Sequence, residues 1–181
     1  MNLLGIAGSL RAGSFNASLI RAAGAVAPDG TGVTPFDRLG EIPPYNDDEK
    51  QKAIPAAVTA LAEEIRAADG LLISTPEYNY GVSGVLKNAI DWISRVPDQP
   101  FKNKPIGVMG AAMGGLGTAR AQYDLRRSFI FLEGLVMNRP EIFVGAAHTK
   151  FDENGALTDA ATRDILTDYM KALTAWVERV G

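Results

Sequence analysis

The sequence predicts a doubly wound α/β fold, in which helices cover both faces of a parallel β-sheet. Five short runs rich in valine, isoleucine and leucine alternate with longer segments of helical periodicity, and a glycine- and serine-rich loop follows the first run. Strands that alternate with helices pair in parallel through right-handed crossovers, so the loops after the strands gather at one edge of the sheet. We expect any ligand at that edge, beyond the carboxyl ends of the strands.

The predicted elements follow the order βαβαβαβαβα. The strands are expected at residues 3–7, 32–36, 70–75, 106–110 and 142–145, and the helices at about residues 16–26, 55–68, 82–96, 118–137 and 159–180. Five strands favour the flavodoxin-like order 2-1-3-4-5 over a six-stranded dinucleotide-binding sheet. Residues 40–51, with paired prolines and three successive acids, predict a surface loop. The chain shows no repeat or linker, so we expect residues 1–181 to form one domain.

Composition narrows the class of protein. The 181 residues are 46% hydrophobic and 22% charged with a net charge of −3, as in an ordinary soluble globular protein. No apolar run approaches the roughly 20 residues of a membrane span, and the first residues lack the layout of a signal peptide. The chain has no cysteine, which excludes a disulfide framework and fits a reducing compartment. We therefore expect neither a membrane nor a nucleic-acid partner.

The loop at residues 8–16 (GSLRAGSFN) is the strongest functional signal. It joins the first strand to the first helix, where the helix N-terminus offers unpaired N–H groups and the positive end of its dipole. Ser9, Ser14 and Asn16 add neutral side-chain donors, and the planar fork of Arg11 suits phosphate oxygens. The loop therefore predicts a site for a monophosphate.

Two familiar glycine motifs do not fit this loop. A P-loop ends in a lysine before its serine or threonine, and neither residues 8–16 nor residues 110–117 contain that lysine. The glycine spacing of the dinucleotide fingerprint is also absent. A plain turn in which Ser14 or Asn16 only caps the helix remains an alternative. Phosphate binding is favoured because Arg11 and the further hydroxyls exceed what a cap requires.

A second informative loop, residues 75–81 (TPEYNYG), follows the third strand and leads to residues 86–92 (LKNAIDW) on a helix. Strands one and three are neighbours in the order 2-1-3, so this loop and the first line one crevice. Its aromatic, amide and carboxylate groups suit a flat heterocycle. A proline-initiated turn with Asn79 or Gly81 in the left-handed conformation is the alternative, and both roles can coexist.

The third loop, residues 111–118 (AAMGGLGT), leaves the fourth strand. Its glycines let the backbone approach a ligand, and its N–H groups could face an anionic edge. Taken alone this loop is weak evidence, because flexibility at a helix start explains it equally well. Together the three loops predict a site with a phosphate end and a heterocycle end.

Few side chains of this sequence are candidates for catalytic groups. The chain has no cysteine nucleophile and no G-x-S-x-G elbow, and its single histidine, His148, is expected at the surface. The same scarcity argues against a transition-metal site. An enzyme of this composition would leave the chemistry to a bound cofactor.

Six short motifs resemble the NAD(P)H-dependent FMN reductase family. They are GSLR at residues 8–11, SFN at 14–16, PEYN at 76–79, LKNAIDW at 86–92, RAQY at 120–123 and LR at 125–126. The resemblance extends from residue 1 to about residue 145 and is nearest to the bacterial quinone and chromate reductases. It implies a flavodoxin-like fold, bound FMN, NADH or NADPH as electron donor, and a soluble cytoplasmic oligomer. The implied reaction is two-electron reduction of quinones and similar acceptors, with chromate and azo compounds as candidates.

The resemblance also assigns roles to positions in this chain. The FMN contacts would be Ser9, Leu10, Arg11, Ser14, Phe15, Asn16, Pro76, Glu77, Tyr78, Asn79, Ala112, Met113 and Gly114. The loop at residues 8–16 would hold the phosphate and ribityl end, and residues 76–79 would border the isoalloxazine ring. Backbone amides of residues 112–114 would approach the N1/O2 edge, where reduced flavin accumulates negative charge. No side chain is needed as catalytic acid or base, although Tyr78 or water could supply protons.

Two other functions stay open at this point. A flavodoxin-type electron carrier would bind FMN without nicotinamide chemistry, but the weak net charge argues against docking to basic partners. A non-catalytic module that senses nucleotides is the third possibility. For an enzyme with one crevice serving donor and acceptor in turn, we expect ping-pong kinetics.

Apolar side chains also predict an assembly. The helix at 82–96 carries one apolar stripe of Leu86, Ile90 and Ile93 and a second of Val85, Ala89 and Trp92. The next helix carries four successive apolar residues at 129–132. One apolar face of each helix can pack on the sheet, and the other apolar face must be buried against another surface. We expect a homodimer through these two helices, paired again into a homotetramer, with Glu141 as a candidate partner of Arg120 across the interface.

Overall fold

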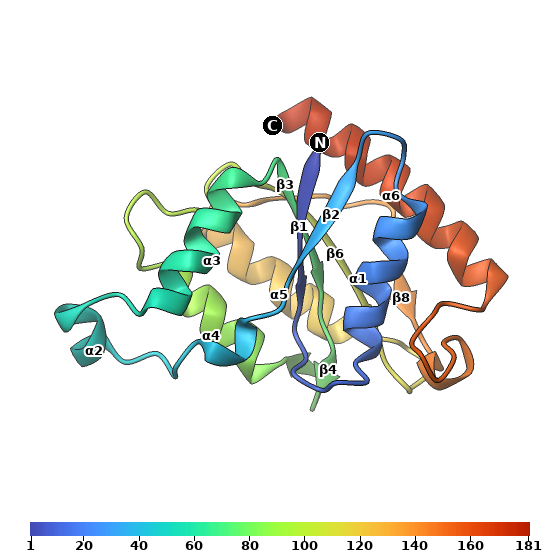
Figure 1. The fold of residues 1–181 in the computed structure, drawn as a ribbon, viewed down its shortest axis with the longest axis horizontal. Coiled ribbons are helices and arrows are strands. Elements are labelled where there is room, and N and C mark those ends of the chain that lie inside the picture. Colours follow the sequence, from blue (N-terminus) through green and yellow to red (C-terminus); the bar gives the residue numbers. More distant parts are fainter.

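A computed structural model of residues 1–181 shows a central parallel sheet between two layers of helices (Figure 1). The main strands are β1 (Asn2–Ala7), β2 (Gly32–Phe36), β3 (Gly70–Ser74) and β6 (Pro105–Ala111), followed by the short β7 (Leu135–Val136) and β8 (Phe143–Val144). Their order is β2-β1-β3-β6-β7, with β8 also paired to β6. The predicted doubly wound fold and strand order are therefore confirmed.

Six α-helices and two 3₁₀ turns complete the fold. The helices are α1 (Phe15–Val26), α2 (Asp47–Lys52), α3 (Ala56–Ala67), α4 (Gly84–Ile93), α5 (Ala119–Phe131) and α6 (Ala160–Val180), and the turns are η1 (Leu39–Glu41) and η2 (Ala147–Thr149). One apolar core joins the sheet to α3, α4 and α5, and a second joins it to α1 and α6. Every residue of β3 and β6 is buried, as expected of central strands covered on both faces.

The fifth strand differs from its prediction. It is split into β7, which pairs with the first residues of β6, and β8, which pairs with the last. β7 lies inside the segment 118–137 that the periodicity assigned to one helix. α5 ends at Phe131 because the backbone turns there: Glu133 has a positive φ of 55°, and the Gly134 N–H donates to the Phe129 carbonyl.

The prediction of a surface loop at residues 40–51 was wrong for the second half of this segment, which forms α2. Asn46 caps this helix by accepting a hydrogen bond from the Asp48 N–H at 3.0 Å. The three acids occupy the first turn and two lysines the last, which matches the helix dipole. The acidic run is therefore a helix start rather than a loop.

The helix predicted at residues 82–96 is shorter than expected and spans Gly84–Ile93. Before it, β4 (Glu77–Tyr78) and β5 (Gly81–Val82) form a two-stranded hairpin. Its turn residues Asn79 and Tyr80 have φ values of 51° and 68°. Two successive positive φ angles are typical of the tight turns that join two antiparallel strands, because such turns match the right-handed twist of the strands. The left-handed conformation predicted for Asn79 is present, and its companion is Tyr80 rather than Gly81.

No helix in the structure has both the length and the apolar character needed to cross a membrane.

Candidate functional site

A crevice of about 300 Å³ opens where β1, β3 and β6 end. It is lined by Ser9, Arg11, Ser14, Phe15, Asn16, Pro76, Glu77, Tyr78, Ala111, Ala112 and Met113. The three predicted loops therefore meet in one place. Leu10, Asn79 and Gly114 do not line the crevice, and Ala111 is a lining residue that sequence reasoning did not single out.

The first loop presents a row of free backbone donors. Ser14 is the N-cap of α1, and its hydroxyl accepts a hydrogen bond from the Ala17 N–H at 3.2 Å. No hydrogen bond is made by the N–H groups of residues 10–13, Phe15 or Asn16. The cap predicted from the sequence is thus real, and it leaves the first N–H groups of the helix open to an anion.

Arg11 lies at the mouth of the crevice. Its Nη2 donates to the Gly13 carbonyl at 2.7 Å, and its Cζ lies 5.3 Å from the centre of the Phe15 ring. These contacts hold the guanidinium beside the free N–H groups and leave most of its five donors available. The loop therefore combines a positive charge with backbone donors, the groups that a phosphate requires.

Asn16 has a different place from the one predicted. Its side chain is buried, donates to the Ala111 carbonyl at 3.0 Å and accepts from the Ala111 N–H at 3.0 Å and the Ser74 hydroxyl at 2.9 Å. These bonds tie the start of α1 to the ends of β3 and β6. The side chain thus fixes the three walls of the crevice relative to one another, and a contact with a ligand stays a prediction.

The first two loops also pack against each other directly. The Ser83 hydroxyl donates to the Gly8 carbonyl at 2.6 Å, and the hydroxyls of Ser9 and Tyr78 lie 3.3 Å apart. A Cβ on Gly8 would lie 3.0 Å from Cδ of Pro76. A side chain at this position would require Pro76 and Ser83 to shift, so glycine favours the close approach of the two loops.

Glu77 uses its carboxylate within the protein. One oxygen accepts from the backbone N–H groups of Arg120 and Ala121 at 3.1 Å each, and the other accepts from Nε of Arg120 at 2.6 Å. The guanidinium of Arg120 also lies 3.6 Å from the centre of the Tyr80 ring. Glu77 therefore caps α5 and anchors the hairpin, a role that its place next to Pro76 did not indicate.

In the third loop only part of the backbone is free. The Ala112 N–H donates to the Val144 carbonyl and the Ala112 carbonyl accepts from Ala147, both at 3.0 Å. The N–H groups of Met113 and Gly114 make no hydrogen bond. Of the amides predicted to face a ligand, these two remain available.

The pair expected between Arg120 and Glu141 across a subunit interface stays a prediction, and within the chain both residues have other neighbours. Arg120 is paired with Glu77, and Glu141 faces Tyr123 and lies 3.9 Å from Arg139. Glu141 raises the pKa of Tyr123, mainly by accepting the hydrogen bond of its hydroxyl. His148 is exposed in η2 and does not line the crevice.

The second apolar stripe of α4 is covered within the chain, contrary to expectation. Trp92 and Ala89 are buried, the Trp92 indole N–H donates to the Pro43 carbonyl at 2.8 Å, and the Tyr45 ring packs edge-on against Trp92. The segment containing Pro43 and Tyr45 supplies this cover. In α5, by contrast, Ile130 and Phe131 are 79% and 84% exposed.

The fold is flavodoxin-like, and the crevice at the ends of its strands combines free backbone donors, an arginine and an exposed aromatic side chain. A sequence model of the NADPH-dependent FMN reductase family matches residues 1–149, and the chain belongs to this family. It is therefore an oxidoreductase that uses FMN with a reduced nicotinamide dinucleotide as electron donor.

Individual relatives agree over nearly the whole chain. An NAD(P)H-dependent FMN reductase of Pseudomonas aeruginosa is 46% identical over 180 residues, which cover 99% of this chain and 97% of the relative. A quinone reductase of Escherichia coli is 44% identical over 182 residues, with the same coverage. Among solved structures, FerB, a flavoenzyme NAD(P)H:acceptor oxidoreductase of Paracoccus denitrificans, matches with a TM-score of 0.90 and 32% identity, covering 99% of this chain and 98% of that one.

Proposed function

We propose that this protein transfers two electrons from a reduced nicotinamide, through FMN in the crevice, to quinones. The observation that carries the proposal is the row of free N–H groups at residues 10–13, Phe15 and Asn16 beside the guanidinium of Arg11. Residues 10–13 are exposed and Phe15 and Asn16 begin α1, so these N–H groups point from an open loop and a helix N-terminus, an arrangement suited to a phosphate dianion.

The residues present fit FMN along its length. Ser9, Arg11 and the free N–H groups would hold the phosphate. Pro76 and Tyr78 would border the ring, with the Tyr78 side chain 53% exposed and so able to lie along a planar ligand. The free N–H groups of Met113 and Gly114 would stabilise negative charge at the ring's pyrimidine edge. FMN, when bound, supplies the two-electron chemistry, and the chain supplies position and charge stabilisation.

Quinones are the proposed acceptor class for two reasons. The relatives in Escherichia coli and in a Burkholderia species are named as quinone and 2-hydroxy-1,4-benzoquinone reductases. The loops around the crevice also carry exposed apolar side chains, with Met113 63% and Leu116 64% exposed, which suit a flat apolar acceptor better than a charged one. Chromate and azo compounds are further candidates to be tried in the same assay.

A homodimer is the proposed assembly, and α5 rather than α4 carries it. Ile130 and Phe131 are the most exposed large apolar side chains of the molecule and lie next to each other at the end of α5. Exposed neighbours of this size mark interaction surfaces, and a second copy of the chain is the proposed cover. The homotetramer expected from the sequence would need a second contact of its own.

The test is an absorbance spectrum of the flavin-loaded protein before and after anaerobic addition of NADH or NADPH. The proposal predicts that the visible flavin band bleaches within the mixing time and returns when a quinone is added. Bound flavin that neither donor bleaches would identify an electron carrier or a sensing module instead.

A further inference from the structure

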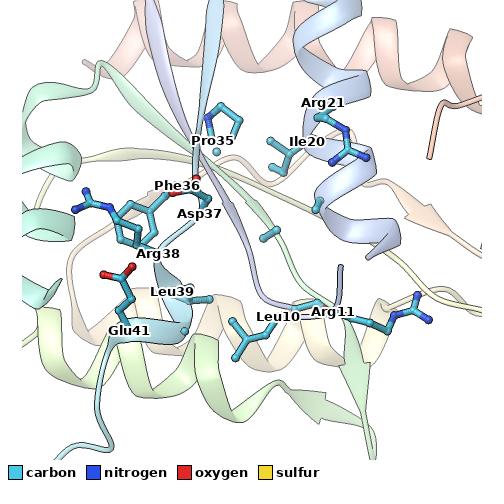
Figure 2. Close-up of a pocket in the computed structure, with 15 residues that line it drawn as sticks. Leu10, Arg11, Ile20, Arg21, Pro35, Phe36, Asp37, Arg38, Leu39 and Glu41 are labelled. Carbon is cyan, nitrogen blue, oxygen red and sulfur yellow. The ribbon is translucent and has the colours of Figure 1, made fainter. Parts of the chain in front are cut away.

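A second cavity lies on the other side of the loop that follows β1. Its volume is about 460 Å³, larger than the crevice, and it lies between α1, the end of β2 and η1 (Figure 2). Ser9 and Arg11 line both cavities, so the two adjoin at this loop. The two cavities share only these two residues, so FMN bound in the crevice would leave the second cavity free.

The walls of the second cavity are mainly apolar. Leu10 and Ile20 face it from the first loop and α1, and Phe36 and Leu39 face it from β2 and η1 (Figure 2). Leu10 is 57% exposed, and its side chain reaches η1, where a Cβ on Gly40 would lie 3.3 Å from it. Aliphatic and aromatic walls of this kind suit the flat face of a nucleobase.

Three arginines and two carboxylates also line the second cavity. Arg38 forms an ion pair with Glu64 and lies over the Phe36 ring. Arg11 donates to the Gly13 carbonyl at 2.7 Å and Arg21 donates to the Ser18 hydroxyl at 2.9 Å, so both have neutral partners and keep free donors.

The carboxylates of the second cavity are free. Asp37 and Glu41 are exposed, and their carboxylates make no hydrogen bond or ion pair in the structure. These carboxylates are open hydrogen-bond acceptors. They suit a ligand that presents neutral donors, such as a sugar diol.

The position of Asp37 agrees with this chemistry. The register pairs Phe36, the last residue of β2, with Ile6 of β1, so Asp37 emerges beside the start of the first loop. In nucleotide-binding βαβ units, an acid near the end of the second strand accepts hydrogen bonds from a ribose diol. Asp37 has that place in the topology, although the glycine fingerprint of those units is absent.

We propose that the second cavity binds the adenosine end of the nicotinamide donor, with Asp37 accepting hydrogen bonds from the ribose hydroxyls and the apolar walls holding the adenine. The inference rests on the proposed function, because it places the other end of the same donor next to the crevice.

The test compares Asp37→Ala with a matched control, Asp29→Ala. Asp29 is exposed, makes no hydrogen bond and lies outside the cavity, so both variants lose one surface charge and no contact. Stopped-flow reduction of the bound flavin gives the donor Kd. We expect Asp37→Ala to raise the Kd for NADH about tenfold, the scale of one charge-assisted hydrogen bond. Reduced nicotinamide mononucleotide, which lacks adenosine, should bind both variants and the unaltered protein equally.

A second readout does not depend on turnover. Calorimetric titration with adenosine 5′-monophosphate should show binding to the flavin-loaded protein, unchanged in Asp29→Ala and about tenfold weaker in Asp37→Ala. The inference is overturned if this nucleotide does not bind, or if Asp37→Ala weakens NADH and the mononucleotide alike. If no donor reduces the flavin, the proposed function fails instead, and the calorimetric titration alone decides the role of the cavity.

Discussion

Replacing Arg11 by alanine tests the phosphate end of the crevice. The guanidinium is held by the Gly13 carbonyl at 2.7 Å and by the Phe15 ring, so it loses little freedom when it binds an anion. A hydrogen bond to a charged group contributes about 1.5–3 kcal/mol, and the solvent exposure of Arg11 favours the lower end of that range. We therefore expect Arg11→Ala to raise the Kd of FMN about tenfold. The free N–H groups remain, so binding should weaken without being lost.

The assay is fluorescence titration of the apo-protein with FMN and, separately, with riboflavin. Only FMN carries the phosphate, so Arg11→Ala should weaken FMN and leave riboflavin nearly unchanged. Arg179→Ala, which removes an exposed arginine from α6, is the matched control. An unchanged FMN affinity in a variant with an unaltered circular dichroism spectrum would remove Arg11 from the site. An equal loss for both ligands would show that Arg11 acts on the loop and not on the phosphate.

Three further predictions concern stability and assembly. Glu77→Ala should lower the free energy of unfolding in urea by about 2 kcal/mol, because it removes the cap of α5 and the partner of Arg120. Glu77→Gln should lower this free energy by about half as much. A urea midpoint for Glu77→Ala equal to that of the unaltered protein would refute the capping role. Thr162 lowers the pKa of Asp159 by donating its hydroxyl and its backbone N–H, so Asp159 stabilises the fold above the ordinary aspartate pKa of about 3.9, and this contribution disappears as pH falls through the lowered pKa. Asp159→Asn should therefore flatten the acid limb of the unfolding free energy, whereas Asp164→Asn, which alters a nearby exposed acid, should leave its slope intact. Phe131→Asp should convert the proposed dimer to a monomer in sedimentation equilibrium, and Ile165→Asp on α6 should not; a dimer that persists in Phe131→Asp would exclude the end of α5 from the interface.

The sequence was sufficient for the first four strands of the sheet and for the three loops that meet at the crevice. Buried strands alternating with helices leave little freedom of topology, because crossovers are right-handed and loops gather at one edge. The places where the periodicity failed have local causes. Asn46 caps α2 just before an acidic run, and the positive φ of Glu133 ends α5 early. Neither feature changes the pattern of apolar residues, so a prediction based on that pattern could not detect them.

Side-chain roles within the crevice were harder to predict than its location. Asn16 and Glu77 are polar residues in binding loops, which is the usual pattern of ligand contacts. Their partners are Ala111 and Arg120, which are distant in sequence, so only the fold could show that both side chains bond within the protein. Likewise, the stripe on α4 is covered by Tyr45 and Pro43, whose positions no helical periodicity could supply.

In the proposed function, one crevice takes electrons from a nicotinamide and later gives them to a quinone. Anaerobic stopped flow measures the two half-reactions separately: reduction of the bound flavin by NADH, and reoxidation of the isolated reduced protein by a quinone. We expect each half-reaction to occur without the other substrate, both to be fast enough to explain turnover, and double-reciprocal plots to be parallel. A reduced protein that reacts with quinone only while the oxidised nicotinamide is present, or plots that intersect, would require a ternary complex and contradict the single shared crevice.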